Sequence, residues 1–166
     1  MDEKKRRYTK KPVTADKALQ RLATLCARSE QCSADIRRKL AGYGLAPEEC
    51  REVLQKLVDN SFVDDRRYAG SVARDKVRFV GWGKAKIRMA LYAKGLRGEI
   101  VDEALASIEA ADYKEALLRV ARTKARSLDL RQRADRDKFV RHIVSRGFEP
   151  ALAFRVLEAA VRKLEK

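Results

Sequence analysis

Arginine residues recur at helical spacing in two stretches of this sequence, and their chemistry is the most informative feature of the chain. In the first stretch, Arg67, Arg74 and Arg78 are separated by seven and four residues, so an α-helix would carry them on one face. A second stretch has similar spacing at Arg119, Arg122 and Arg126. Like charges so placed repel by roughly 0.2–0.5 kcal/mol per pair in an isolated helix. Because guanidinium groups make forked hydrogen bonds to phosphates and carboxylates, both faces are predicted to bind an anionic partner.

Further basic residues and the only tryptophan lie at the end of the first stretch. Lys76 belongs to that stretch, and beyond it Lys84 and Arg88 are one helical turn apart. Lys86 stands on a different face of the same segment. Trp82, between two glycines, has two interpretations. It is either a buried anchor that joins two helices or a platform on which a base or a partner stacks, a contact worth ~1–3 kcal/mol.

The sequence offers little for catalysis. Asp64 and Asp65 could in principle hold Mg²⁺, but aspartate before a helix is more commonly an N-cap. The segment Gly81-x-Gly83 is too short for a nucleotide-binding fingerprint, and His142 is the only histidine. No nucleophile with its base and no metal cluster is recognisable. We therefore predict that the protein is not an enzyme and has no cofactor and no metal site.

Composition points to a polyanionic partner. The 166 residues carry a formal net charge of +15, which favours fast association with nucleic acid or an acidic protein, although a merely solvated basic surface is the alternative. Three cysteines without a C-x-x-C pair indicate reduced thiols in the cytoplasm. No apolar run approaches the ~20 residues that span a bilayer, so no membrane association is predicted.

The helices that must position these residues follow a repeated pattern around Gly44, Gly95 and Gly147. Apolar residues stand eight and four positions before each glycine and one, nine, ten and thirteen positions after it. The glycines are 51 and 52 residues apart. Each unit is predicted to contain a helix that a left-handed glycine ends, a tight turn and a second helix, with a further helix upstream.

The pattern predicts an all-α fold of three tandem three-helix repeats that form an elongated, curved molecule. The expected repeats are residues 15–61, 62–111 and 112–166, after a basic, disordered arm at residues 1–14. A unit of this size buries little apolar surface alone, so neighbouring repeats should share a core. Helix–turn–helix outlines of this kind occur in DNA-binding proteins and in plain helical bundles alike.

With these residues in view, the chain resembles the RecX regulatory proteins of bacteria, which modulate the RecA recombinase. The similarity covers most of the chain, from about Ala18 to Leu164. It is strongest in the motif FVDDRRYA at 62–69, followed by WGxxxIRxxLxxxGL at 82–96 and RSxxCSxxIRxKL at 28–40. It is weakest in the third repeat, which has a charged insertion at 131–137, and Arg66 stands where the family often has an acid.

The resemblance implies a monomer that lies in the groove of the RecA–DNA filament. It would bridge protomers and suppress ATPase activity, strand exchange and filament growth, within recombination, DNA repair and the SOS response. The alternatives are a module that binds single- and double-stranded DNA weakly and nonspecifically and acts through DNA alone, and a helical-repeat adaptor for an acidic protein. The candidate contacts to the filament or to DNA are Arg67, Arg74, Lys76, Arg78, Trp82, Lys84, Lys86, Arg88, Arg119, Arg122 and Arg126.

Overall fold

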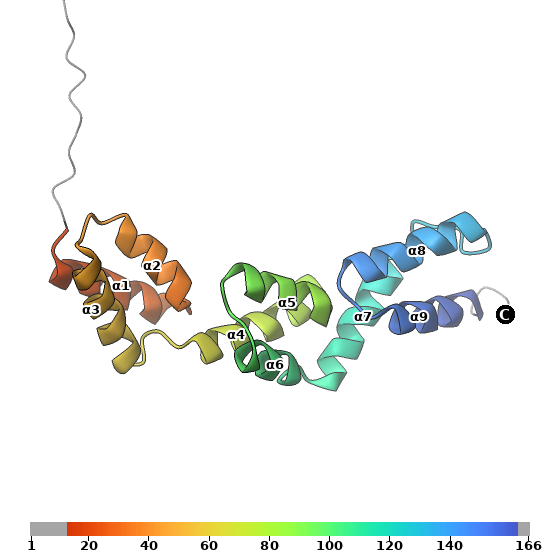
Figure 1. The fold of residues 1–166 in the computed structure, drawn as a ribbon. Coiled ribbons are helices and arrows are strands. Elements are labelled where there is room, and N and C mark those ends of the chain that lie inside the picture. Colours follow the sequence, from red (N-terminus) through yellow and green to blue (C-terminus); the bar gives the residue numbers. More distant parts are fainter. Residues whose placement is uncertain (1–12, 163–166) are drawn as a thin grey trace, which may run out of the picture. The chain divides into compact units, whose positions relative to one another are not determined.

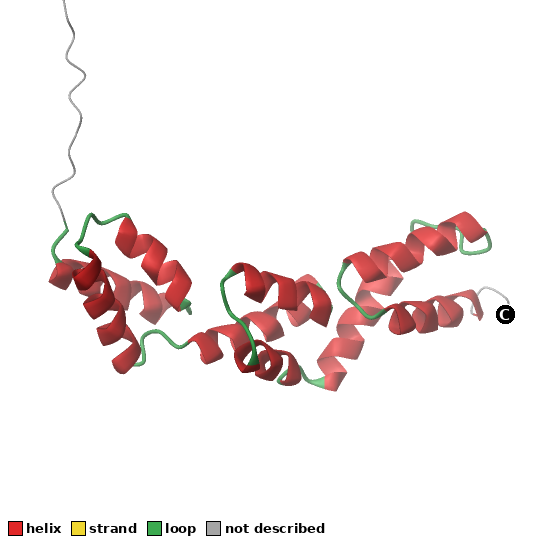
Figure 2. Ribbon diagram, in the orientation of Figure 1, coloured by secondary structure: helices red, strands yellow, loops and turns green. Residues whose placement is uncertain are grey.

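The computed structural model describes residues 13–162, and every regular element in that range is a helix (Figures 1 and 2). The α-helices are α1 (Ala15–Arg28), α2 (Ser33–Ala41), α3 (Pro47–Asp59), α4 (Asp65–Asp75), α5 (Lys84–Ala93), α6 (Glu99–Ala106), α7 (Ala110–Ala125), α8 (Arg133–Ser145) and α9 (Pro150–Arg162). A short π-helix, Lys76–Val80, continues α4. The prediction of an all-α fold is confirmed. The predicted basic arm, residues 1–14, lies almost wholly outside the described residues.

The glycines that punctuate the sequence pattern lie two or three residues beyond the ends of α2, α5 and α8 and have the predicted left-handed conformation. Gly44, Gly95 and Gly147 have φ angles of +74°, +80° and +93°. The residues eight and four positions before each glycine are at most 1% exposed in every unit. Since burying one such side chain contributes about 1.5–3 kcal/mol, these positions account for much of the drive to form each helix pair.

By contacts, the chain divides into two compact units, Met1–Asp64 and Asp65–Lys166. In the first unit, α1, α2 and α3 each turn one face inward, and these three faces form a small core. Its buried residues are Ala18, Leu22, Ile36, Leu40, Val53, Leu57 and Val63. Two helix starts are capped: Thr14 Oγ1 accepts a hydrogen bond from Lys17 N, and the Glu49 carboxylate accepts one from Ala46 N at 2.8 Å.

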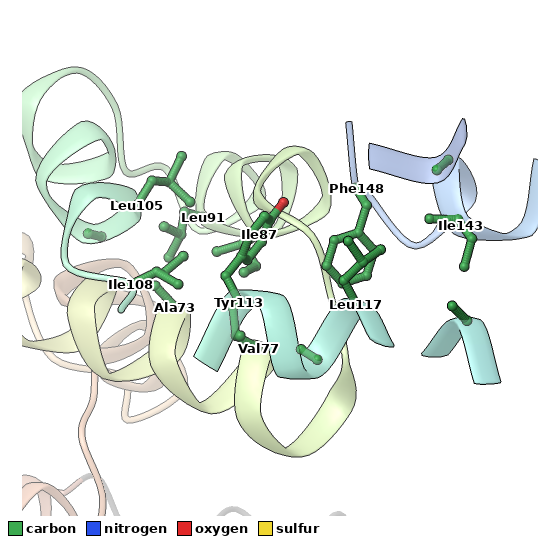
Figure 3. Close-up of a cluster of buried hydrophobic side chains, with 14 of the residues drawn as sticks. Ala73, Val77, Ile87, Leu91, Leu105, Ile108, Tyr113, Leu117, Ile143 and Phe148 are labelled. Carbon is green, nitrogen blue, oxygen red and sulfur yellow. The ribbon is translucent and has the colours of Figure 1, made fainter. Parts of the chain in front are cut away.

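The second unit has one continuous core that runs through α4 to α9. Ile87 of α5 and Tyr113 and Leu117 of α7 belong to it, together with Phe148 before α9 (Figure 3). The Tyr113 and Phe148 rings have centroids 5.2 Å apart in a tilted arrangement. The predicted boundary at residue 111 therefore lies within one shared core, and the division into a second and a third repeat there stays a prediction.

Backbone contacts join the start of α5 to the turn between α8 and α9. Gly83 N donates to Arg146 O at 2.8 Å, and Ala85 N donates to Gly147 O at 3.1 Å. A Cβ atom on Gly83 would lie only 2.1 Å from the carbonyl carbon of Gly147. Here, glycine is required by the close approach of two chain segments. This glycine joint holds the residues around Trp82 in a defined position relative to α8 and α9.

Candidate functional site: a basic surface on the second unit

The chain segment that carries Trp82 is shaped by the π-helix after α4. Gly81 ends this helix in the left-handed conformation, with a φ angle of +68°, and its N–H donates to Val77 O. Trp82 N donates to Lys76 O at 3.0 Å. A π-helix has a wider turn than an α-helix and is frequent at functional sites. Because of this wider turn, Arg78 is rotated from the position that α-helical spacing after Arg74 would give it.

Two lysines lie over the ring of Trp82. The Lys76 and Lys86 ammonium groups are 4.9 Å and 5.1 Å from its ring centroid, within cation–π range. The ring is half-buried and packs against the core of the second unit. Of the two interpretations of Trp82, this packing favours the anchor. A stacking partner would have to share the ring with two positive charges.

Lys84 has a similar aromatic neighbour in α7. Its ammonium group is 5.3 Å from the ring centroid of Tyr113, and its backbone N–H donates to the Tyr113 hydroxyl at 3.1 Å. That hydroxyl donates to Glu149 Oε2 at 2.7 Å. Burial raises the pKa of Tyr113 well above its ordinary value, which keeps the hydroxyl protonated as a donor. The network ties Lys84 to the glycine joint.

Two of the predicted contact residues have acidic partners within the protein. Arg78 Nε is 2.7 Å from Asp112 Oδ2, and Arg88 Nη1 is 2.8 Å from Asp102 Oδ1. Hydrogen bonds to Tyr92 and then Asp102 raise the pKa of Arg88, so this guanidinium stays charged. These ion pairs connect helices of the second unit, and each would compete with binding of an external anion.

The side chain of Arg119 binds backbone carbonyls of the π-helix, a role that its spacing in the sequence did not indicate. Its Nη2 donates to Arg78 O at 2.6 Å and to Val77 O at 3.3 Å, at the end of the π-helix. Arg146, which the sequence analysis did not select, reaches the same helix end, where Nε donates to Gly81 O and Nη2 to Val80 O. Carbonyl groups at a helix end lack partners and carry partial negative charge, so both contacts are favourable.

Three other predicted contact residues form no ion pair or hydrogen bond among the described residues. Among the described residues, the side chains of Arg74, Arg122 and Arg126 have no ion-pair or hydrogen-bond partner. Arg74 is folded over Gly70, with Nη1 3.1 Å from where a Cβ of that residue would be. Arg67 is exposed at the start of α4 and has an interaction of its own. Arg74, Lys76 and Lys86, which have no ion pair among the described residues, are called the basic surface below.

An exposed apolar side chain was also missed. Phe79, at the end of the π-helix, is 80% exposed, more than any other large hydrophobic side chain among residues 13–162. Its neighbour Val80 is 38% exposed. The only local signal is an apolar pair that directly precedes Gly81, and the register of an ordinary α-helix would not have identified it.

The environment of His142 gives a pH-dependent stability. Its pKa lies below the ordinary value of 6.5, mainly because the ring is partly buried. The positive charges of Lys124 and Arg146 lower the pKa further. The unfolded chain therefore binds a proton at this histidine more readily than the folded protein does. The stability that the neutral His142 gives the fold above its ordinary pKa is lost as the pH falls through its lower folded-state pKa. We expect urea unfolding to show lower stability at pH 5 than at pH 7.5. His142→Gln should reduce this difference, and an unchanged difference would assign it to other groups.

Helices arranged in glycine-punctuated units define a helical-repeat protein. Among the described residues, no helix is long and apolar enough to cross a bilayer, and no cluster of His, Cys, Asp and Glu could hold a metal ion.

Comparison with known proteins gives the family. Residues 64–105 match the family model described as RecX, second three-helix domain. Regulatory protein RecX of Chromohalobacter salexigens is 34% identical over 75% of this chain and 80% of its own length. Its counterpart in Mycolicibacterium vanbaalenii is 30% identical over 91% of this chain and 90% of its length. The chain belongs to the RecX family of regulatory proteins.

Solved structures agree on the fold. A crystal structure of regulatory protein RecX aligns with a TM-score of 0.75 at 22% identity, over 87% of this chain and 71% of the other. RecX from Lactobacillus salivarius aligns with a TM-score of 0.72 at 18% identity, over 91% and 96%. At these identities the likeness concerns the fold alone, and it supports the helical-repeat architecture.

Proposed function

We propose that this protein inhibits a RecA-type recombinase by lying in the groove of the RecA–DNA filament. Its relatives are named regulatory protein RecX, and the family name motivates the choice of RecA as the partner. The observation that carries the proposal is the basic surface, whose cations have no ion pair among residues 13–162. We further propose that the protein acts as a monomer in the cytoplasm and by binding alone, within recombination, DNA repair and the SOS response.

Occupancy accounts for the inhibition. A protein that fills the filament groove excludes incoming duplex DNA and, because it binds several protomers at once, disfavours their exchange. Strand exchange, ATP hydrolysis and filament growth would fall together. The net charge of +15 would speed association with the negatively charged filament.

The predicted contact residues take two roles in this proposal. Arg74, Lys76 and Lys86 contact phosphates or carboxylates of the filament, and Arg67, Lys84, Arg122 and Arg126 extend that contact. Arg78, Arg88 and Arg119 hold the second unit together through Asp112, Asp102 and the π-helix carbonyls. Trp82 supports the two lysines that lie over it.

The test is steady-state ATP hydrolysis by RecA on single-stranded DNA with increasing amounts of this protein. We expect inhibition at near-stoichiometric or lower ratios of protein to RecA, and we expect it to persist when free DNA is in excess. Inhibition that vanishes with excess DNA would favour the alternative, a DNA-binding module that sequesters DNA. In that case affinity for DNA alone should fall with salt by a log–log slope of about 0.7–0.9 per phosphate contact.

A further inference from the structure

The third repeat contains an open groove whose apolar lining the proposed filament contact does not explain. Its lining residues come mainly from α7, α8 and α9, and its volume is about 400 Å³. Figure 1 shows how these three helices are arranged. Pockets that bind ligands in proteins commonly fall in this size range. The floor is apolar and includes Leu118, Leu130, Phe139 and Val156.

Every charged side chain that lines the groove is basic. These are Arg122 and Arg126, one helical turn apart at the end of α7. No acidic residue lines the groove, and within residues 13–162 neither guanidinium has a partner. An apolar cavity with two unpaired guanidinium groups is complementary to a ligand that combines apolar groups with carboxylates.

The shape of the groove suits a helix. On α7, the lining residues Leu118, Ala121, Arg122, Ala125 and Arg126 recur at intervals of three and four and form a stripe two turns long. On α9, the lining residues are Val156, Ala159 and Ala160. Alanines on both walls let another backbone approach closely. A stripe of this length and spacing is how grooves that accept amphipathic helices are lined.

We propose that this groove binds an acidic amphipathic helix of a partner protein. The apolar side chains of that helix fill the cavity above Phe139 and Leu130, and its carboxylates pair with Arg122 and Arg126. The site needs neither DNA nor a filament. Arg122 and Arg126 would then serve both this site and the proposed filament contact, whereas the apolar lining would serve the helix alone.

The probe is a fluorescein-labelled peptide of about four helical turns. Leucines at intervals of three and four form its apolar face, and glutamates flank them. Fluorescence anisotropy with the full chain, without DNA or recombinase, should show saturable binding. A matched peptide with glutamine for glutamate should bind roughly tenfold more weakly, since two exposed ion pairs contribute a few-fold each. Equal binding of the two peptides would overturn the proposal.

Variants of the protein locate the binding. Ala159→Phe should fill the groove from its exposed side and reduce peptide affinity by roughly tenfold or more, through loss of one buried apolar contact site. Ala151→Phe is the matched control, because Ala151 is exposed on the same helix but outside the groove, and it should have no effect. Circular dichroism establishes that both variants are folded.

A second pair of variants does not alter packing. Arg122→Gln with Arg126→Gln should weaken the peptide about tenfold. Arg131→Gln with Arg133→Gln removes the same charge outside the groove and should leave affinity unchanged. Unchanged peptide binding in Ala159→Phe would overturn the proposal. Concentration-dependent self-association that Ala159→Phe abolishes would also overturn it, since a second copy of this chain would then occupy the groove.

Discussion

Gly147→Ala is expected to lower the free energy of unfolding of the second unit by about 2–5 kcal/mol, the largest stability effect of any single change considered. The left-handed backbone accounts for roughly 1–2 kcal/mol of this. The remainder comes from overpacking, because a Cβ on Gly147 would lie 2.5 Å from both Lys86 N and Lys86 Cβ. The backbone of α5 would have to move away from the α8–α9 turn. Urea unfolding followed by circular dichroism measures the loss.

The repeats supply a matched control. Gly95 occupies the equivalent position one repeat earlier, with a φ angle of +80° and no atom within 4 Å of where its Cβ would be. Gly95→Ala should therefore cost only the backbone contribution of roughly 1–2 kcal/mol. If Gly147→Ala were no more destabilising than Gly95→Ala, the glycine joint would contribute nothing beyond local conformation.

The positions of the three glycines could be predicted from the sequence, but the atoms that surround each of them could not. Gly44, Gly95 and Gly147 were identifiable as helix ends because the apolar pattern stops at each of them in the same way. Their different surroundings were not identifiable. Gly147 meets α5 through contacts between residues far apart in the chain, whereas Gly95 meets open space, and local spacing contains no signal for either.

In the candidate site, too, some features could be predicted from the sequence and others could not. Composition and spacing predicted a positively charged surface that contacts a filament or DNA, and that contact stays a prediction. Which of the basic residues have free charge depended on tertiary contacts. Asp112 and Asp102 lie 34 and 14 residues beyond their arginine partners, and a pairing at that range cannot be inferred from helical periodicity.

The π-helix shows a second limit. Spacings of seven and four predicted one arginine face through Arg67, Arg74 and Arg78, on the assumption of 3.6 residues per turn. From Lys76 to Val80 the turn is wider, so the assumption does not hold there. The same change leaves Phe79 exposed and brings the ends of Arg119 and Arg146 to the carbonyls that close the helix.

Replacing Arg74, Lys76 and Lys86 together with glutamate is expected to abolish inhibition of RecA-driven ATP hydrolysis. The concentration needed for half-inhibition should rise by roughly 100-fold or more, because like charges placed opposite one another at an interface cost several kcal/mol. These residues have no ion pair within the described fold, so helicity should be retained. Reversing Arg78 would be less informative, because it would place a carboxylate beside Asp112 and disturb the fold itself.

The control for this variant changes the net charge by the same amount on the other unit. Arg21, Arg37 and Lys39 are exposed on α1 and α2, and none has an ion pair among the described residues. Their replacement with glutamate should raise the half-inhibitory concentration only modestly, through slower electrostatic association. Equal loss of inhibition in both variants would mean that total charge, and not the surface around Trp82, determines binding. Full inhibition by the first variant would remove that surface from the mechanism.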